Sequence, residues 1–137
     1  MEIHHSTSQP ETEAIAAAMA DKAVKGDIYL LEGNLGAGKS VFARAFIRHL
    51  CGAETEVPSP TFTLVQTYDS PKGPIWHFDL YRLNDPDEIY NIGWEEALAN
   101  GVVLVEWPSR LGALKPKNAQ TISIETLGPE SRTIKIS

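Results

Sequence analysis

Apolar side chains recur at helical spacing in two stretches of the N-terminal half of this 137-residue sequence. Over residues 9–25 they fall three or four positions apart, and Ser8 and Glu11 have the spacing of a capping box at the start of that stretch. We therefore expect one helix over 9–25 that ends at Gly26, and a second helix over 40–50. The side chains expected on the buried faces are Ile15, Ala18, Met19 and Ala23 in the first helix, and Val41, Phe42, Ala45, Phe46 and Leu50 in the second.

Short apolar runs alternate with these helical patterns and predict β-strands. Residues 27–32 and 102–106 are almost unbroken apolar runs, which is typical of parallel strands buried on both faces. Residues 61–68 and 75–80 flank a turn-forming segment rich in Pro and Gly, so we expect them to form a hairpin. The other expected elements are a broken helical segment over 84–99 and a C-terminal hairpin of strands 121–125 and 132–136.

The eight residues between the first predicted strand and the second helix carry the strongest chemical signal. Residues 33–40 read Gly-Asn-Leu-Gly-Ala-Gly-Lys-Ser, which fits the phosphate-binding pattern G-x-x-x-x-G-K-[ST] at every fixed position. In such a loop the backbone N–H groups and the start of the helix bind phosphate oxygens. Lys39 is expected to neutralise the β- and γ-phosphates, and the hydroxyl of Ser40 is expected to bind Mg²⁺.

The order of the elements and this loop together predict a fold class. We expect an α/β fold, namely a three-layer P-loop NTPase with a mixed, partly parallel central sheet. At this length, residues 1–137 are expected to form a single P-loop ATPase domain. The nucleotide is expected at the C-terminal ends of the parallel strands.

Composition restricts the surroundings in which the protein would act. The net charge of −6 does not provide the basic surface that direct binding of nucleic acid usually needs, so any RNA is expected to be held by a partner. Cys51 is the single cysteine, which excludes an intrachain disulfide and favours a reducing compartment. We expect a cytoplasmic protein without a membrane contact, because no apolar run reaches about 18 residues and the start does not resemble a signal peptide.

Two acidic residues end apolar strands and are candidates for positioning a metal ion. Glu106 follows the more continuous apolar run, so we expect it to hold Mg²⁺ together with Ser40. Asp79 is expected to orient the attacking water or to sense the γ-phosphate; the alternative is an acid that holds Arg82 or caps a turn. His77, in the middle of a predicted strand, is expected to be a hydrogen-bonded structural histidine more readily than a catalytic base.

Two further segments have a functional and a purely structural interpretation. Ser59, Pro60 and Thr61 lie where nucleotide hydrolases often place a switch segment, but an ordinary loop bracketed by prolines fits the sequence equally well. Trp107 directly follows Glu106, so its indole is expected either near the nucleotide or packed in the core. The sequence contains no Asn-Lys-x-Asp motif for reading guanine, which favours ATP over GTP.

Four blocks of sequence together resemble the bacterial TsaE family, also called YjeE. They are the phosphate loop, Ser59-Pro60-Thr61-Phe62, residues 77–83 (HFDLYRL) and residues 104–108 (LVEWP). The resemblance covers roughly residues 8–110. It implies a small P-loop ATPase that acts with TsaB and TsaD in making N6-threonylcarbamoyladenosine next to the anticodon of tRNAs that read ANN codons. It also implies that ATP hydrolysis resets the complex for further turnovers, and that the protein contacts tRNA only indirectly, through that complex.

The resemblance also implies roles for particular residues. It makes Lys39 and Asp79 the candidate catalytic residues, and Ser40 and Glu106 the metal ligands. Ser40 replaces a threonine that many members have, and Asn34 replaces a frequent aspartate. The region of Thr7 and Ser8 resembles the segment that approaches the adenine, and the expected ATP-binding residues are Thr7, Ser8, Gly36, Ala37, Gly38, Lys39, Ser40, Val41 and Trp107.

Two other functions are compatible with a phosphate loop. One is a small-molecule kinase, which would need an acceptor pocket and usually an arginine-rich lid. The other is an interaction module that binds its partner according to the bound nucleotide and whose hydrolysis is incidental. Since neither Arg44 nor Arg82 has the spacing of an arginine finger, we expect slow ATP hydrolysis by the free protein and stimulation by its partners.

Overall fold

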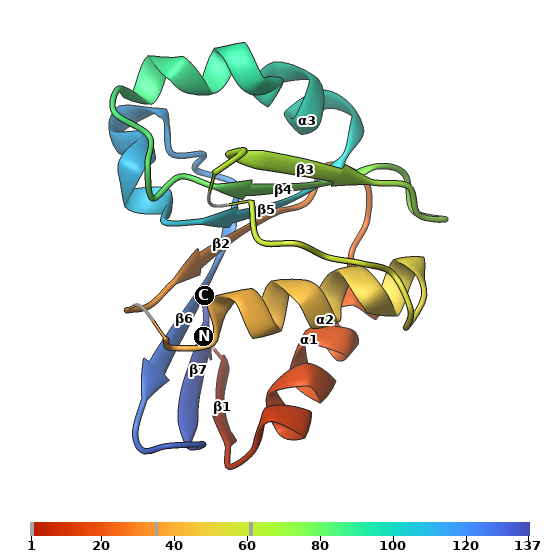
Figure 1. Ribbon diagram of the computed structural model, residues 1–137, viewed down its shortest axis with the longest axis vertical. Helices are drawn as coiled ribbons and strands as arrows, with labels where there is room; N and C mark the ends of the chain where they lie inside the picture. The colour runs from red at the N-terminus through yellow and green to blue at the C-terminus, as the bar shows by residue number, and fades with distance from the viewer. Residues whose placement is uncertain (1, 35, 61) are drawn as a thin grey trace.

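The structure is a computed structural model that describes residues 2–34, 36–60 and 62–137. Twelve elements are defined in these residues, with η denoting a 3-10 helix (Figure 1). In chain order they are β1 (Glu2–Ser6), α1 (Gln9–Lys22), β2 (Ile28–Glu32), α2 (Lys39–Cys51), β3 (Val65–Tyr68), β4 (Ile75–Asp79), η1 (Pro86–Ile92), α3 (Trp94–Asn100), β5 (Val102–Glu106), η2 (Pro108–Leu114), β6 (Gln120–Thr126) and β7 (Arg132–Ile136).

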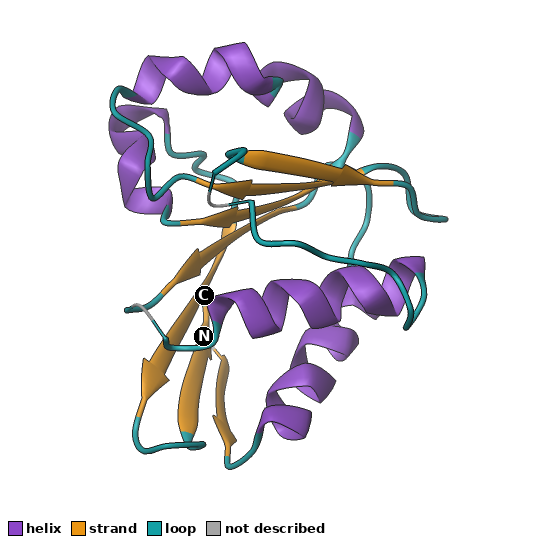
Figure 2. Ribbon diagram, in the orientation of Figure 1, coloured by secondary structure: helices purple, strands orange, loops and turns teal. Residues whose placement is uncertain are grey.

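One seven-stranded sheet, in the order β1-β7-β6-β2-β5-β4-β3, forms the middle layer. Strands β6, β2, β5 and β4 run parallel to one another, β3 pairs antiparallel with β4 at one side, and at the other side β7 pairs antiparallel with β6 and β1 antiparallel with β7. Helices α1 and α2 cover one face, and η1, α3 and η2 cover the other (Figure 2). The predicted fold class, a three-layer α/β fold with a mixed, partly parallel sheet, is confirmed.

The central strands are apolar throughout because both faces of the sheet are covered. In β5, Val102 and Leu104 pack in the core under α1 and α2, while Val103 and Val105 pack in the core under α3 and the 3-10 helices. Because parallel strands end at the same edge, the C-terminal residues of β2, β4 and β5 lie together; Glu106 is in register with both Leu31 and Asp79. This edge positions the candidate site.

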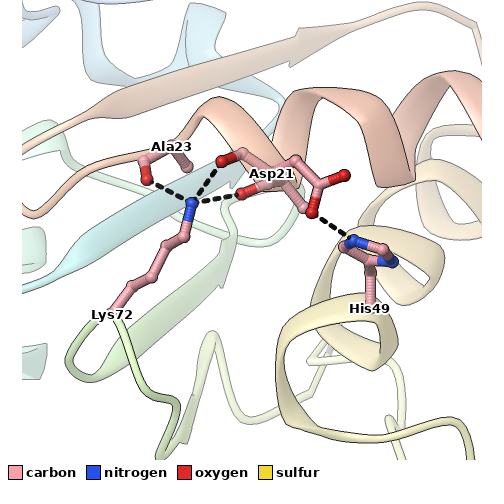
Figure 3. Close-up of polar contacts among 5 residues, drawn as sticks. Asp21, Ala23, His49 and Lys72 are labelled. Atoms are coloured by element: carbon pink, nitrogen blue, oxygen red, sulfur yellow. Dashed lines mark hydrogen bonds and ion pairs between the residues drawn. The ribbon is translucent and has the colours of Figure 1, made fainter.

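Helix α1 is shorter than predicted, and its buried face agrees only in part with the expected one. Ser8 is its N-cap as expected, but the helix ends at Lys22, and Ala23 is already extended. Lys72, in the turn between β3 and β4, donates hydrogen bonds to the carbonyl oxygens of Ala20, Asp21 and Ala23 and so caps this end (Figure 3). Ile15 and Met19 pack partly buried against the core and Ala23 is fully buried, as predicted, but the prediction of Ala18 on the buried side is wrong because Ala18 is exposed. The buried residues of the helix itself are Thr12, Ala16 and Ala20.

Helix α2 and the hairpins agree more closely with the expectations. Phe42 and Phe46 are buried as predicted, but Val41, Ala45 and Leu50 are only partly buried, and the remaining core contacts come from Ala43 and Ile47. The hairpins β3–β4 and β6–β7 are both present. Strand β3 begins only at Val65, since Leu64 has a left-handed backbone (φ 69°), and Thr61 lies outside the described residues.

Two elements were not predicted. Strand β1 pairs with β7 at the edge of the sheet, and its sequence Glu-Ile-His-His-Ser lacks the apolar alternation that signals a strand. The 3-10 helix η2 follows β5 and contains Leu111, which is fully buried. In the described part of the chain, no helix has the length and the apolar character needed to cross a membrane.

Candidate nucleotide-binding site

The glycine-rich loop turns the chain from β2 into α2 at the edge where the parallel strands end. Gly38 is the N-cap of α2, and its backbone lies in the left-handed region (φ 107°) that favours glycine. A glycine brings no side-chain oxygen to the first N–H groups of the helix, so these donors can bind an anion. Gly33 is required for another reason, because a Cβ atom there would lie 2.7 Å from the carbonyl oxygen of Ile124 in β6.

Lys39 is a buried cation at the start of α2, with only 6% of its surface exposed. Its ammonium donates hydrogen bonds to the carbonyl oxygens of Gly33 and Asn34, and its Nζ lies 3.7 Å from the centroid of the Trp107 ring. Burial lowers the pKa of Lys39, and the nearby carboxylates of Glu106 and Asp79 oppose this shift. These contacts hold the positive charge next to the loop.

Ser40 and Glu106 meet although they lie 66 residues apart in sequence. The hydroxyl of Ser40 donates a hydrogen bond to Oε1 of Glu106 at 3.2 Å, and Glu106 is 2% exposed. Two oxygen donors side by side suit Mg²⁺, which in nucleotide sites takes one or two protein ligands together with waters and phosphate oxygens. In the chain as described, no group of three or more His, Cys, Asp and Glu side chains is placed to hold a metal ion.

His77 contacts the other oxygen of the same carboxylate. Its Nε2 lies 2.7 Å from Oε2 of Glu106, and both side chains are almost completely buried. The prediction of a hydrogen-bonded histidine is therefore confirmed, but no sequence pattern named Glu106 as its partner. One sequence pattern could have placed His77 near the site: His77 and Asp79 are two residues apart in one strand, so their side chains lie on the same face of the sheet.

Asp79 ends β4 beside Glu106 and is 4% exposed. Its Oδ1 accepts a hydrogen bond from the backbone N–H of Tyr81 at 3.0 Å, which agrees with the alternative that it caps a turn. The guanidinium of Arg82 lies 4.5 Å from the centroid of the Phe62 ring. The catalytic role of Asp79 stays a prediction.

Trp107 has a left-handed backbone (φ 59°, ψ 52°), which is uncommon for a residue with a large side chain. The indole packs against the ring of Tyr81, with 4.9 Å between the ring centroids, and against the ammonium of Lys39. The indole thus lies beside Lys39 of the loop and also packs, partly buried, against the core under α3 and the 3-10 helices.

These side chains surround one opening, which we call the phosphate cavity. Asn34 and Tyr81 line it together with residues that were predicted for the site, namely Gly36, Gly38, Lys39, Ser40, Val41, Asp79, Glu106 and Trp107.

A second opening, which we call the side pocket, lies next to the phosphate cavity and shares Gly38 and Val41 with it. Its walls come from the start of α1, from the loop and from the β6–β7 hairpin: Gln9, Thr12, Ala37, Gly38, Val41, Pro129, Glu130 and Arg132. Arg132 ties the hairpin to the loop, because its Nε donates a hydrogen bond to the carbonyl oxygen of Ala37 at 2.8 Å. No local pattern singled out Gln9, Thr12, Glu130 or Arg132.

Some predicted residues lie away from these two openings. Ser8 caps α1, and Thr7 donates hydrogen bonds to the carboxylate of Glu11 through its N–H and its hydroxyl. Ser59 is exposed and Pro60 is buried; among the described residues that line either opening, neither of them occurs. Thr61 lies outside the described residues, so the switch segment stays a prediction.

Known proteins resemble this chain in sequence and in fold over nearly its whole length. Residues 6–134 match the family described as threonylcarbamoyl adenosine biosynthesis protein TsaE. The tRNA threonylcarbamoyladenosine biosynthesis protein TsaE of Rickettsia conorii is 40% identical over 134 residues, which is 98% of this chain and 77% of that protein. The protein of the same name from Bacillus subtilis is 39% identical over 125 residues, which is 90% of this chain and 77% of that protein. The crystal structure of Bacillus subtilis YdiB matches with a TM-score of 0.79 and 32% identity, and the match covers 98% of this chain and 83% of the YdiB chain. The chain therefore belongs to the TsaE family, in agreement with the resemblance of its four sequence blocks.

Proposed function

We propose that this protein is a Mg²⁺-dependent ATPase that supports the threonylcarbamoyladenosine modification of tRNA while docked on a TsaB–TsaD complex. The observation that carries the proposal is the phosphate cavity, where Lys39, Ser40 and Glu106 converge on a glycine-rich loop at the start of α2. A buried lysine and a helix N-terminus offer positive charge, and the adjacent serine and glutamate offer oxygen ligands.

The residues present fit a magnesium ion. Ser40 Oγ and the Glu106 carboxylate are already within hydrogen-bond distance of each other, so both oxygens could bind the same cation. A bound Mg²⁺ would supply positive charge to the β- and γ-phosphate oxygens.

The chain's own groups account for the remaining steps of hydrolysis. Lys39 would exchange the carbonyl oxygens of Gly33 and Asn34 for phosphate oxygens and neutralise their charge. Asp79 lines the same cavity, where its carboxylate would orient the attacking water. Trp107 closes one side of the cavity and would limit the access of bulk water to the phosphates.

The base of the nucleotide would occupy the side pocket. This pocket shares Gly38 and Val41 with the phosphate cavity, so a nucleotide with its phosphates on the loop could extend its base into it. Gln9 and Thr12 supply polar groups there, and the predicted adenine segment Thr7–Ser8 directly precedes Gln9. We propose adenine as the base, since the guanine-reading motif is absent from the sequence.

The acidic net charge supports an indirect role toward tRNA. A protein with a net charge of −6 is poorly suited to hold a polyanion, so the partner proteins would contact the tRNA and ATP turnover would reset their complex. We further propose that residues 1–137 act as a single ATPase domain, and that the protein works in the cytoplasm, where tRNA modification takes place.

The test is phosphate release from ATP, measured with and without a purified TsaB–TsaD pair. Slow release by the protein alone and a clear increase with the pair would support the proposal. Transfer of the γ-phosphate to a metabolite would instead identify a small-molecule kinase. Docking that depends on the bound nucleotide without any phosphate release would identify an interaction module.

A further inference from the structure

We infer that His77 is a positioning residue that holds the Glu106 carboxylate in the orientation needed to bind the nucleotide's cation together with Ser40. The inference rests on the proposed Mg²⁺–nucleotide site and adds a residue to it. His77 does not itself line the phosphate cavity among the described residues, so it would act only through Glu106.

The first support is that the two carboxylate oxygens of Glu106 have different partners. Oε1 accepts the hydrogen bond of Ser40 at 3.2 Å, and Oε2 lies 2.7 Å from Nε2 of His77. A carboxylate bonded at both oxygens cannot rotate without breaking one of these contacts. His77 thus fixes the side of the carboxylate that points away from the loop, which leaves Oε1 facing Ser40.

The second support is the position of His77 in the sheet. His77 is in register with Leu104, and Asp79 is in register with Glu106, so all four side chains stand on the face covered by α2. Two neighbours of His77 on this face, Ile75 and Leu104, are buried apolar side chains, and burying an imidazole against them is costly unless it is hydrogen-bonded. Glu106, one residue pair further along the strands, supplies that bond.

The third support comes from the other ring nitrogen. Nδ1 of His77 is buried, and within the described chain it has no hydrogen-bond partner. If Nδ1 carried the only ring proton, that proton would belong to a buried donor without a partner, and Nε2 could not donate to Glu106. The hydrogen-bond network therefore places a proton on Nε2, from which the ring donates to Oε2 of Glu106. Such a contact to a metal-binding carboxylate typically changes metal affinity by about 10- to 100-fold.

The experiment compares two variants of His77 with the parent protein. His77→Gln keeps an N–H donor near the position of Nε2, whereas His77→Met has a similar length and no donor. The affinity for Mn²⁺, a paramagnetic substitute for Mg²⁺, is measured by electron paramagnetic resonance with a non-hydrolysable ATP analogue bound. The affinity for the analogue alone is measured in the presence of EDTA.

We expect His77→Met to weaken Mn²⁺ binding by about 10- to 100-fold while the metal-free affinity for the analogue stays near the parent value. His77→Gln should restore most of the Mn²⁺ affinity. His49→Met is the matched control, because His49 forms a similar contact, 2.6 Å from Nε2 to Oδ1 of Asp21, on the surface between α1 and α2 (Figure 3). This control should bind Mn²⁺ like the parent.

Several results would overturn the inference. Parent-like Mn²⁺ affinity in His77→Met would show that Glu106 needs no help from His77. Equal losses in the Met and Gln variants, or an equal loss of metal-free analogue binding, would show that His77 only fills space. A parent protein that binds no Mn²⁺ with the analogue would refute the proposed function itself, and the inference with it.

A measurement on the parent protein avoids any failure of the variants to fold. Long-range ¹H–¹⁵N NMR spectra distinguish the two neutral tautomers of histidine. A proton on Nε2 of His77 supports the inference. A proton on Nδ1 and none on Nε2 overturns it, because Nε2 could then not donate to Glu106.

Discussion

Lys39 is held in place before any phosphate arrives. The carbonyl oxygens of Gly33 and Asn34 accept its hydrogen bonds, and the indole of Trp107 lies 3.7 Å from its ammonium. An ammonium over the face of an indole is stabilised by the charge distribution of the ring. Nucleotide binding would therefore exchange these neutral partners for charged phosphate oxygens, which form stronger hydrogen bonds.

Lys39→Ala removes the charge that would face the β- and γ-phosphates. We expect ATP hydrolysis to fall below a tenth of the parent rate while the fold is retained, because the partners of the Lys39 ammonium are two loop carbonyl oxygens and the Trp107 ring at the edge of the sheet. Phosphate release and circular dichroism measure the two effects. The control is Lys22→Ala, because Lys22 is an exposed lysine at the end of α1. This variant should hydrolyse ATP at the parent rate. Turnover of a tenth or more in Lys39→Ala would contradict the role of Lys39.

Asp79→Asn tests whether the second carboxylate acts in turnover. The amide oxygen of asparagine can still accept the hydrogen bond from Tyr81, so the turn after β4 should persist. We expect ATP binding to remain within a few-fold of the parent and hydrolysis to decrease about 100-fold, the lower range for loss of a general base. Calorimetric titration and phosphate release give the two values. If binding is abolished instead, Asp79 belongs with the metal ligands.

Tyr29 gives a pH-dependent prediction about stability. Burial, followed by the hydrogen bond and the charge of Asp27, raises the pKa of Tyr29 well above the ordinary value of 10.0. The folded chain then keeps a proton that the unfolded chain releases above about pH 10. The stability that Tyr29 contributes is therefore fully present below pH 10 and is lost as the pH rises further.

Urea unfolding of the parent and of Tyr29→Phe measures this effect. At pH 8 the parent should be more stable by about 1 kcal/mol, the net value of one hydrogen bond. Above pH 10 that difference should shrink by about 1.4 kcal/mol per pH unit and then change sign. A difference that does not depend on pH would show that Tyr29 ionises equally in both states.

At the scale of elements, the end of α1 is capped by a lysine from another element. The last carbonyl groups of a helix have no partners within it, and their dipoles favour a cation. Lys72 reaches them from a turn about 50 residues away in sequence and donates to three carbonyl oxygens at 2.5–2.9 Å (Figure 3). It thus joins the β3–β4 hairpin to the helix whose first turn lines the side pocket.

Lys72→Met should destabilise the protein because these carbonyl oxygens lose their donor. We expect a cost of about 1–2 kcal/mol in the free energy of unfolding, the range for a cation at a partly buried helix end. Lys25→Met is the matched control, since Lys25 is an exposed lysine just beyond the same helix, and its cost should stay below about 0.5 kcal/mol. Urea unfolding measures both variants, and equal costs would show that the cap contributes nothing.

At the scale of the whole molecule, the site is assembled from distant parts of one sheet. The loop and Lys39 follow β2, Asp79 ends β4, Glu106 ends β5, and the side pocket needs α1 and the β6–β7 hairpin. A nucleotide would contact elements that come together only in the folded chain. Its binding energy should therefore add to the stability of the native state.

ATP with Mg²⁺ at about 100 times its dissociation constant should stabilise the fold by about 2.7 kcal/mol. For a chain of this size that corresponds to a rise of roughly 8 °C in the melting temperature. Calorimetry of the parent with and without Mg²⁺–ATP measures the shift in melting temperature. Lys39→Ala is the control, and its melting temperature should shift much less. An unchanged melting temperature in the parent would contradict the nucleotide site.

The sequence by itself determined the features that depend on neighbouring residues. The phosphate loop was recognisable because its glycines and Lys39 act through one continuous stretch of backbone. Strands β2 and β5 were predictable because burial on both faces requires an unbroken apolar run. The four blocks that indicated the TsaE family are likewise contiguous. The expected pairing of Ser40 with Glu106 followed from the rule that parallel strands end at one edge, and the structure places the two side chains 3.2 Å apart.

Only the tertiary structure decided which surfaces meet. Strand β1 is polar in sequence and exists because β7 offers it an edge. The buried face of α1 includes Ala16 and Ala20 because α2 packs closely there, a contact that the periodicity of α1 cannot specify to within one residue. The bond between His77 and Glu106 and the walls of the side pocket join residues that are far apart in the chain. Sheet register and helix packing set these distances, and both arise from contacts between elements and not from any one segment.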